Sequence, residues 1–153
     1  KAGRPVLLKR GFSATLDEWL CAAEYIAREG CLDIVLCERG VRRSAYWNEA
    51  RSELDLEVIG PARRATPLPV VGDPSHATGD WRRVEAASLE ALRAGAHGLL
   101  IEVLPPSMER ADLRCDPLQG VSADTLQRIM DFARDHRVPE PQGDEAIAAG
   151  ADS

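Results

Sequence analysis

The chain has 153 residues, of which 44% are hydrophobic and 29% are charged, and its formal net charge is −6. This length allows one domain with a hydrophobic core, and the composition is ordinary for a globular protein. The acidic balance argues against a nucleic-acid partner or an anionic membrane surface, because both attract basic proteins. No apolar run approaches the roughly 18 residues of a membrane-spanning helix. We therefore expect neither nucleic acid nor membrane as a partner.

The four cysteines stand at positions 21, 31, 37 and 115. Because no two of them form a C-x-x-C pair, their spacing fits neither a common zinc site nor a disulfide framework. We predict free thiols in a reducing environment, and therefore a cytoplasmic location.

The first half of the chain predicts two strands, each followed by a helix. The first strand covers 6–9, and after it Thr15 and Glu18 form a capping box that opens a helix with apolar residues at helical spacing. The second strand covers 33–37. After a polar loop a short helix follows, interrupted or restarted at Pro61, because proline is tolerated as a first helical residue.

The second half repeats this alternation. A third strand is predicted at 68–72, and Asp80 caps a helix whose apolar face includes Trp81. We therefore expect Trp81 in the core. A fourth strand is predicted at 97–103, and Ser122 caps the last helix.

Strands and helices thus alternate in four βα units of roughly 30 residues each. Each strand is a nearly continuous apolar run, as in a parallel sheet covered by helices. Eight such units close a TIM (β/α)8 barrel in about 250 residues, so four consecutive units predict an α/β half-barrel. We assign 1–137 to the half-barrel and expect a disordered tail at 138–153, which is polar and lacks periodicity. Since the chain lacks an initial Met, we also expect it to be part of a longer protein.

A charged side chain or a histidine follows each predicted strand. In chain order these residues are Lys9 and Arg10, then Arg39, His76 and Glu102. The carboxyl ends of parallel strands meet on one face of the sheet, where such folds hold their active sites. We therefore expect these side chains to form the rim of one site.

Three of the rim residues are candidate metal ligands. His76 and Glu102 follow adjacent strands, which lie about 5 Å apart in a sheet. Asp116, on the loop after the fourth strand, can fold back over the rim. One imidazole nitrogen and two carboxylate oxygens suit Mn²⁺, Fe²⁺ or Zn²⁺. The residues alone leave open whether they bind a metal or form a hydrogen-bonded rim.

Lys9 and Arg39 are candidate anion-binding residues. Arginine offers a fork of donors for phosphate or carboxylate, and lysine a point charge that can also donate a proton. Arg10 faces either the site or the opposite side, because successive strand residues alternate. Glu38 is either a partner that holds Arg39 or Lys9, or part of a buried structural ion pair.

Four segments together resemble the class I 3-deoxy-D-arabino-heptulosonate 7-phosphate (DAHP) synthases, which open the shikimate pathway. The segments are PVLLKRG at 5–11, CERGVR at 37–42, LPVVGDPSHATG at 68–79 and GLLIEV at 98–103. They occur in the family's order over residues 1–137. The run DPSHATG is the most specific, because the related synthase of the eight-carbon sugar acid KDO 8-phosphate usually differs there.

The resemblance implies a TIM barrel of which this chain supplies strands five to eight. It also implies a metal-dependent condensation of phosphoenolpyruvate with erythrose 4-phosphate that releases phosphate. His76, Glu102 and Asp116 correspond to metal ligands of the family. The family's cysteine ligand on the first strand and its Lys-Pro-Arg-Thr-Ser segment for the aldose phosphate have no counterpart here.

Lys9 and Arg39 correspond to the family's phosphoenolpyruvate contacts, and we add Arg10 to this substrate-binding set. We expect Lys9 and His76 to act in catalysis. After Arg42 the chain reads RSAYWN, where the family usually has Thr-Phe-Glu, and the loop before Asp116 is longer than usual. A related phosphoenolpyruvate-using synthase with a different aldehyde therefore stays open as an alternative.

The other alternative is a non-catalytic half-barrel that binds an anion or a partner chain. In either case we expect the chain to need the missing half-barrel or to self-associate, because half a barrel leaves two strand edges unpaired. The face meant for the barrel interior is expected to carry Leu7, Val35, Val70 and Ile101 or their neighbours.

Overall fold

The structure is a computed structural model that describes residues 3–41, 53–113 and 115–136. The tail predicted at 138–153 lies outside these residues. The elements in chain order are β1 (Val6–Lys9), α1 (Leu16–Arg28), β2 (Ile34–Glu38), α2 (Leu56–Ala65), β3 (Val70–Gly72), α3 (Pro74–Thr78), α4 (Trp81–Arg93), β4 (Gly98–Leu99), the 3-10 helix η1 (Arg110–Asp112) and α5 (Ala123–Asp135). Among the described helices, none has the length and apolar character that crossing a membrane requires.

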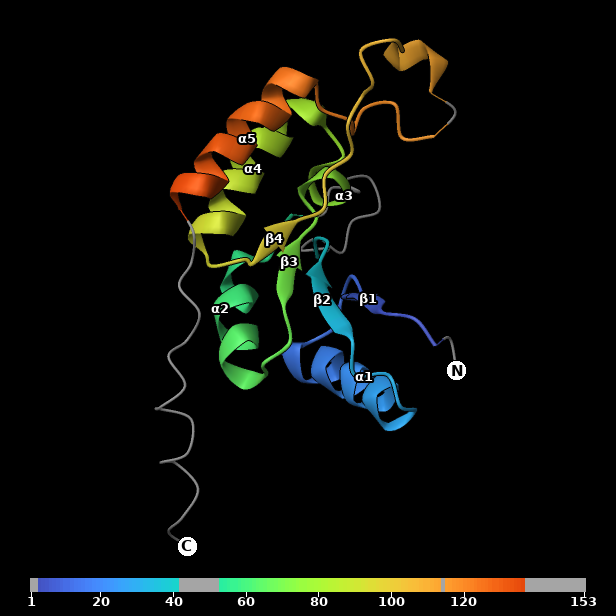
Figure 1. Ribbon diagram of the computed structural model, residues 1–153, viewed down its shortest axis with the longest axis vertical. Coiled ribbons are helices and arrows are strands. Elements are labelled where there is room, and N and C mark those ends of the chain that lie inside the picture. Colours follow the sequence, from blue (N-terminus) through green and yellow to red (C-terminus); the bar gives the residue numbers. More distant parts are fainter. Residues whose placement is uncertain (1–2, 42–52, 114, 137–153) are drawn as a thin grey trace, which may run out of the picture.

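The four strands form one parallel sheet in the order β1-β2-β3-β4, at the centre of the molecule in Figure 1. Its register sets the strand ends side by side, with Lys9 opposite Cys37 and Glu38 opposite Gly72. This arrangement confirms the predicted parallel α/β fold. Because every strand runs the same way, the carboxyl ends of all four lie along one edge of the sheet.

The fourth strand is much shorter than the predicted 97–103. Its ladder ends where the Leu100 N–H donates to the Gly72 carbonyl at 2.8 Å. The residue after β3 is Asp73, which opens α3, so the backbone pairing of the two strands stops at this point. Val103 instead forms an isolated parallel bridge with Val121.

The predicted helix starts are confirmed. Thr15 and Glu18 form both bonds of the capping box, and the Asp80 and Ser122 side chains each accept a backbone N–H of the first turn. The restart predicted at Pro61 is wrong, because α2 runs through this residue without a break. A proline there removes one backbone donor from a short helix that packing holds in place.

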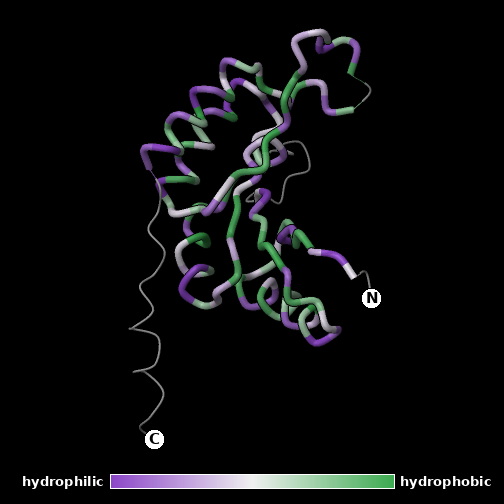
Figure 2. Tube along the Cα trace, viewed as in Figure 1, coloured by the Kyte–Doolittle hydropathy of each residue, from purple (hydrophilic) through white to green (hydrophobic). Residues whose placement is uncertain are grey.

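Helices α1, α2 and α4 pack on one face of the sheet, and α5 packs against α4 (Figure 1). Figure 2 shows that the strands are largely hydrophobic segments. The core joins Leu36 and Val70 of the sheet to Trp19 of α1, Ile59 of α2 and Ala91 of α4, each at most 2% exposed. These contacts anchor the sheet whose ends carry the predicted site residues.

The prediction that Trp81 lies in the core is wrong, since its side chain is 37% exposed. Trp81 is the first residue of α4, and the fully buried positions of this helix begin at Val84. The Trp81 ring instead lies under the Arg110 guanidinium, 4.5 Å from the ring centroid.

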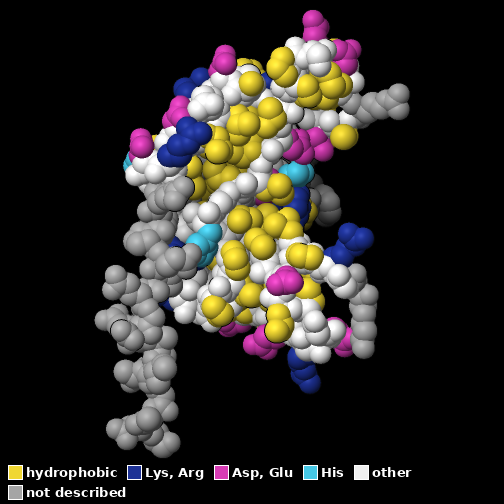
Figure 3. All heavy atoms as spheres, viewed as in Figure 1, with side chains coloured by type: hydrophobic (Ala, Val, Ile, Leu, Met, Phe, Trp, Pro, Cys, Tyr) yellow, Lys and Arg dark blue, Asp and Glu magenta, His cyan; other side chains and the backbone are white. Residues whose placement is uncertain are grey.

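The other face of the sheet is only partly covered. Leu7 is 44% exposed, and Leu100 is 36% exposed. Figure 3 shows hydrophobic side chains gathered over the strands in this view. Of the residues predicted for this face, Val70 itself is in the core, so its neighbour Val71 is the residue of β3 that faces the other way.

Arg10 points into a buried ion-pair network under the helices. Its Nη1 donates to Oε2 of Glu38 at 3.1 Å and to Oδ2 of Asp55 at 2.8 Å, and its Nε donates to the Ala14 carbonyl at 2.8 Å. Arg10 is 7% exposed, and Glu38 is fully buried. This placement contradicts the prediction that Arg10 binds substrate, and it identifies Glu38 as part of a structural pair.

We expect Arg10→Met to lower the free energy of unfolding by about 3–5 kcal/mol, because it leaves the buried Glu38 carboxylate without its cation. Urea denaturation measures this loss. The matched control is Arg128→Met, which breaks an exposed pair with Glu85 and should leave the urea midpoint nearly unchanged. If both substitutions changed the urea midpoint by the same small amount, the Arg10 network would stabilise the fold no more than an exposed ion pair does.

Candidate functional site

The polar segment after β3 folds into the short helix α3. The Asp73 carboxylate caps it by accepting the His76 backbone N–H at 3.1 Å, and Gly79 ends it in a left-handed conformation with φ of 62°. Glycine adopts this conformation without a steric cost. Ser75 Oγ accepts the backbone N–H of Glu102 at 2.9 Å. The short helix therefore positions His76 and also ties down the chain at Glu102.

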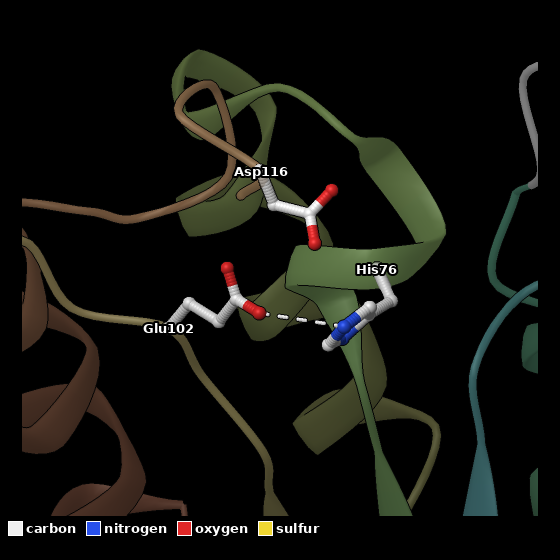
Figure 4. Close-up of side chains that lie close together, drawn as sticks. All are labelled: His76, Glu102 and Asp116. Carbon is white, nitrogen blue, oxygen red and sulfur yellow. Dashed lines mark ion pairs between the residues drawn. The ribbon is translucent and has the colours of Figure 1, made fainter. Parts of the chain in front are cut away.

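The structure brings His76, Glu102 and Asp116 together, and we call these three residues the His76 cluster (Figure 4). One potential ligand atom from each lies within 4.8 Å of the other two. His76 Nε2 and Glu102 Oε1 are 3.3 Å apart. Asp116 reaches the cluster from the long loop after β4, with a backbone φ of 48°, and Gln119 Nε2 donates to its Oδ1 at 3.2 Å.

Asp73 is a site residue that the sequence did not reveal. Its carboxylate is fully buried and lies 2.9 Å and 3.0 Å from His76 Nδ1 through Oδ2 and Oδ1. Lys9 Nζ donates to the same Oδ2 at 3.0 Å. The only sequence signal was its place just before the proline of a helix start, and this signal predicts a cap rather than a contact to an imidazole.

The donor set of the His76 cluster fits a divalent cation. The Asp73 carboxylate contacts Nδ1 of the imidazole, so the opposite ring nitrogen, Nε2, is the one that faces the other residues of the cluster. One imidazole nitrogen with two carboxylate oxygens is a common ligand set for Mn²⁺, Fe²⁺ and Zn²⁺.

The loop that carries Asp116 is held against α4. Arg110 Nη1 donates to the Pro117 carbonyl at 3.1 Å, and its guanidinium stacks on Trp81. The Trp81 backbone N–H donates to the Leu118 carbonyl at 2.6 Å. These contacts explain how a residue on a long loop reaches the His76 cluster, and they give the exposed Trp81 a role in place of the predicted core position.

Lys9 is the last residue of β1, and Arg39 directly follows the neighbouring strand β2. The Lys9 side chain is 36% exposed. The Arg39 guanidinium stacks on Phe12, with its Cζ 4.2 Å from the ring centroid. Arg39 Nε is buried and makes no hydrogen bond within the part of the chain that the structure describes. A stacked guanidinium with a buried donor left over is suited to accept an anionic ligand.

Cys37 lies beside this rim but is chemically quiet. It is fully buried at the end of β2, opposite Lys9. Burial and the negative charge of Asp73 raise the pKa of the Cys37 thiol from 9.0 to about 12, although the positive charge of Lys9 opposes this shift. Because the thiolate is the reactive form, this raised pKa lowers the reactivity of the Cys37 thiol at neutral pH.

We expect iodoacetamide at about pH 8 to label the exposed Cys21 and Cys115 quickly and Cys37 only after unfolding, which mass spectrometry distinguishes. Since the folded-state pKa is raised, Cys37 contributes stability that is complete below pH 9 and is lost as the pH rises toward 12. Cys37→Ala should lose less stability over this alkaline range. Rapid labelling of folded Cys37 would contradict both expectations.

The family model described as the DAHP synthetase I family matches residues 1–136. A curated relative, the phospho-2-dehydro-3-deoxyheptonate aldolase of Thermotoga maritima, is 44% identical over 108 residues, which make up 69% of this chain and 31% of that protein. The family model therefore covers most of this chain, whereas the alignment with the relative covers 69% of this chain and only a part of the relative.

Solved structures lead to the same family. The crystal structure of the Thermotoga maritima phospho-2-dehydro-3-deoxyheptonate aldolase (DAHP synthase) matches with a TM-score of 0.77 at 36% identity, over 86% of this chain and 38% of that one. A truncated form of 3-deoxy-D-arabino-heptulosonate 7-phosphate synthase from the same organism matches with a TM-score of 0.77 at 37% identity, over 88% and 51%. The chain thus spans between about a third and a half of the length of these relatives. It belongs to the DAHP synthetase I family.

Proposed function

We propose that the chain is the C-terminal half of a DAHP synthase, which condenses phosphoenolpyruvate with erythrose 4-phosphate and releases phosphate in the first step of the shikimate pathway. Residues 1–137 supply strands five to eight of its TIM barrel. Two observations support this half-barrel: the parallel order β1-β2-β3-β4 with helices on one face, and the 31% to 51% of the relatives' length that the chain spans. The disordered tail at 138–153 and the cytoplasmic location stay predictions.

The observation that carries the proposal is the convergence of the His76 cluster at the carboxyl ends of the strands. TIM-barrel enzymes hold their active sites at this end of the barrel. A divalent ion such as Mn²⁺, Fe²⁺ or Zn²⁺, held by His76, Glu102 and Asp116, supplies Lewis-acid polarisation of the aldehyde carbonyl.

Lys9 and Arg39 bind phosphoenolpyruvate in the proposed site. The stack on Phe12 fixes the plane of the Arg39 guanidinium, so its donors meet a carboxylate or phosphate with little loss of side-chain entropy. Lys9, held at the end of β1 by Asp73, donates a proton from Nζ to the oxygen of the aldehyde as this oxygen gains negative charge. Arg10 has no part, because its charge is already paired with Glu38.

The aldehyde is the least determined part of the proposal. A related synthase that uses another aldehyde needs the same metal and phosphoenolpyruvate contacts. The residues that make these contacts therefore favour neither erythrose 4-phosphate nor another aldehyde. The segment 43–48, where the sequence departs from the family, lies outside the described residues. Comparing erythrose 4-phosphate with other aldose phosphates as co-substrates decides between the two.

The proposed half-barrel requires a partner. Within the described residues, β1 and β4 each have a neighbouring strand on one side only, and such edges pair readily with another chain. The exposed Leu7 and Leu100 belong to the layer that a complete barrel covers. We therefore propose that the chain joins the missing half-barrel or self-associates.

Arg39→Lys keeps the charge but loses the fork of donors. We expect the free energy of phosphoenolpyruvate binding to weaken by about 1.5–3 kcal/mol, the value of a hydrogen bond to a charged group. This corresponds to a dissociation constant about 10- to 150-fold higher by calorimetry. The measurement uses this chain joined to the part of the Thermotoga maritima relative that it does not cover, which we call the completed barrel. Arg128→Lys, on the exposed surface, is the control, and an unchanged constant for Arg39→Lys would contradict the assignment.

The direct test of the proposed function is phosphate release from phosphoenolpyruvate. The completed barrel should release phosphate only when erythrose 4-phosphate and a divalent metal are both present, and His76→Ala should abolish the release together with stoichiometric metal binding. The chain alone should be inactive and larger than a monomer by size-exclusion chromatography, because it lacks the other half of the site. A completed barrel that binds metal but releases no phosphate with erythrose 4-phosphate or with any other aldose phosphate would favour the non-catalytic half-barrel. A monomeric chain that turns over would contradict the proposed need for a partner.

A further inference from the structure

We propose that Asp73 is a positioning residue: it holds the His76 imidazole with its proton on Nδ1, so that Nε2 faces Glu102 and Asp116 as a ready metal ligand. This inference rests on the proposed function, because it concerns the same site. It adds a residue outside the His76 cluster that decides how well the cluster binds a cation.

The Asp73 carboxylate and the His76 imidazole are in direct contact. Both oxygens of Asp73 lie within hydrogen-bond distance of His76 Nδ1, at 2.9 Å and 3.0 Å. The opposite ring nitrogen, Nε2, points to Glu102 at 3.3 Å (Figure 4). A ring held at Nδ1 by a carboxylate has its Nε2 direction and its tautomer fixed together. Such carboxylate–histidine pairs are the usual outer support of metal-binding histidines.

Asp73 and His76 differ in how deeply they are buried. Asp73 is fully buried, whereas the side chain of His76 is 24% exposed, so the imidazole is held from the protein side and its other nitrogen faces outward. A buried carboxylate is tolerated only with strong partners. Lys9 supplies such a partner, because its Nζ donates to Asp73 Oδ2 at 3.0 Å.

A purely structural reading of Asp73 is that it caps α3, since it accepts the His76 backbone N–H at 3.1 Å. Asparagine caps helices about as well as aspartate. Asp73→Asn therefore keeps the cap but replaces a carboxylate by an amide that donates as well as accepts. The substitution separates the cap from the imidazole contact.

The experiment titrates the full chain with Co²⁺ and follows its visible absorption. Asp73→Asn should raise the Co²⁺ dissociation constant about 10- to 100-fold, the usual cost of losing an outer partner of a ligand histidine. The matched control is Glu38→Gln, which also removes a buried, ion-paired carboxylate but lies in the Arg10 network. It should lower stability and leave Co²⁺ affinity and spectrum unchanged.

A second readout needs no substitution. Nitrogen-15 NMR of the metal-free chain, recorded where the spectrum shows an imidazole with one proton, should place this proton on Nδ1 of His76. A proton on Nε2 would overturn the inference even if Asp73→Asn failed to fold.

The Co²⁺ titrations distinguish the positioning role of Asp73 from the metal site itself. If Asp73→Asn binds Co²⁺ as tightly as the unsubstituted chain while His76→Ala binds it weakly, the inference is wrong and the metal site stands. If His76→Ala and the unsubstituted chain bind Co²⁺ equally, or neither binds it, the metal site and the proposed function fail.

Discussion

A fully buried carboxylate at the end of β3 is the constraint around which this end of the sheet is organised. Asp73 is fully buried, so its carboxylate oxygens need partners from the protein. Lys9 of β1 and the backbone N–H of His76 donate to them, and the His76 ring contacts them through Nδ1. Since α3 also holds Glu102 through Ser75, the contacts that satisfy the end of β3 also position the residues of the candidate site.

The sheet carries two networks of ion pairs, one on each face. Two consecutive residues of the chain belong to different networks. Lys9 and Arg10 are neighbours in the chain, but Lys9 reaches Asp73 at the candidate site, whereas Arg10 reaches Glu38 beneath the helices. Alternation of side chains along a strand makes this division unavoidable. It lets one charged pair stabilise the fold while the other stays available for chemistry. Whether Lys9 or Arg10 faces the helices depends on which side of β1 packs against them.

The His76 cluster also combines rigid and loop-borne parts. His76 and Glu102 sit at adjacent points of the sheet edge, but Asp116 comes from a long connection that packing against α4 must place. The Arg110 stack on Trp81 provides that packing at the surface. A loop can vary more than the sheet it crosses, so the position of Asp116 depends on loop packing in a way that the positions of His76 and Glu102 do not.

Local pattern was enough to predict the alternation of strands and helices, their caps and the rim of charged strand ends, because hydrophobic periodicity and cap chemistry act over a few residues. His76 and Glu102 were predicted as neighbours on this ground. The structure alone decided that Arg10 turns inward, that Trp81 is exposed and that Asp73 supports an imidazole. Each of these depends on which face of an element meets its neighbour, and that is set by long-range packing that no short stretch of sequence encodes.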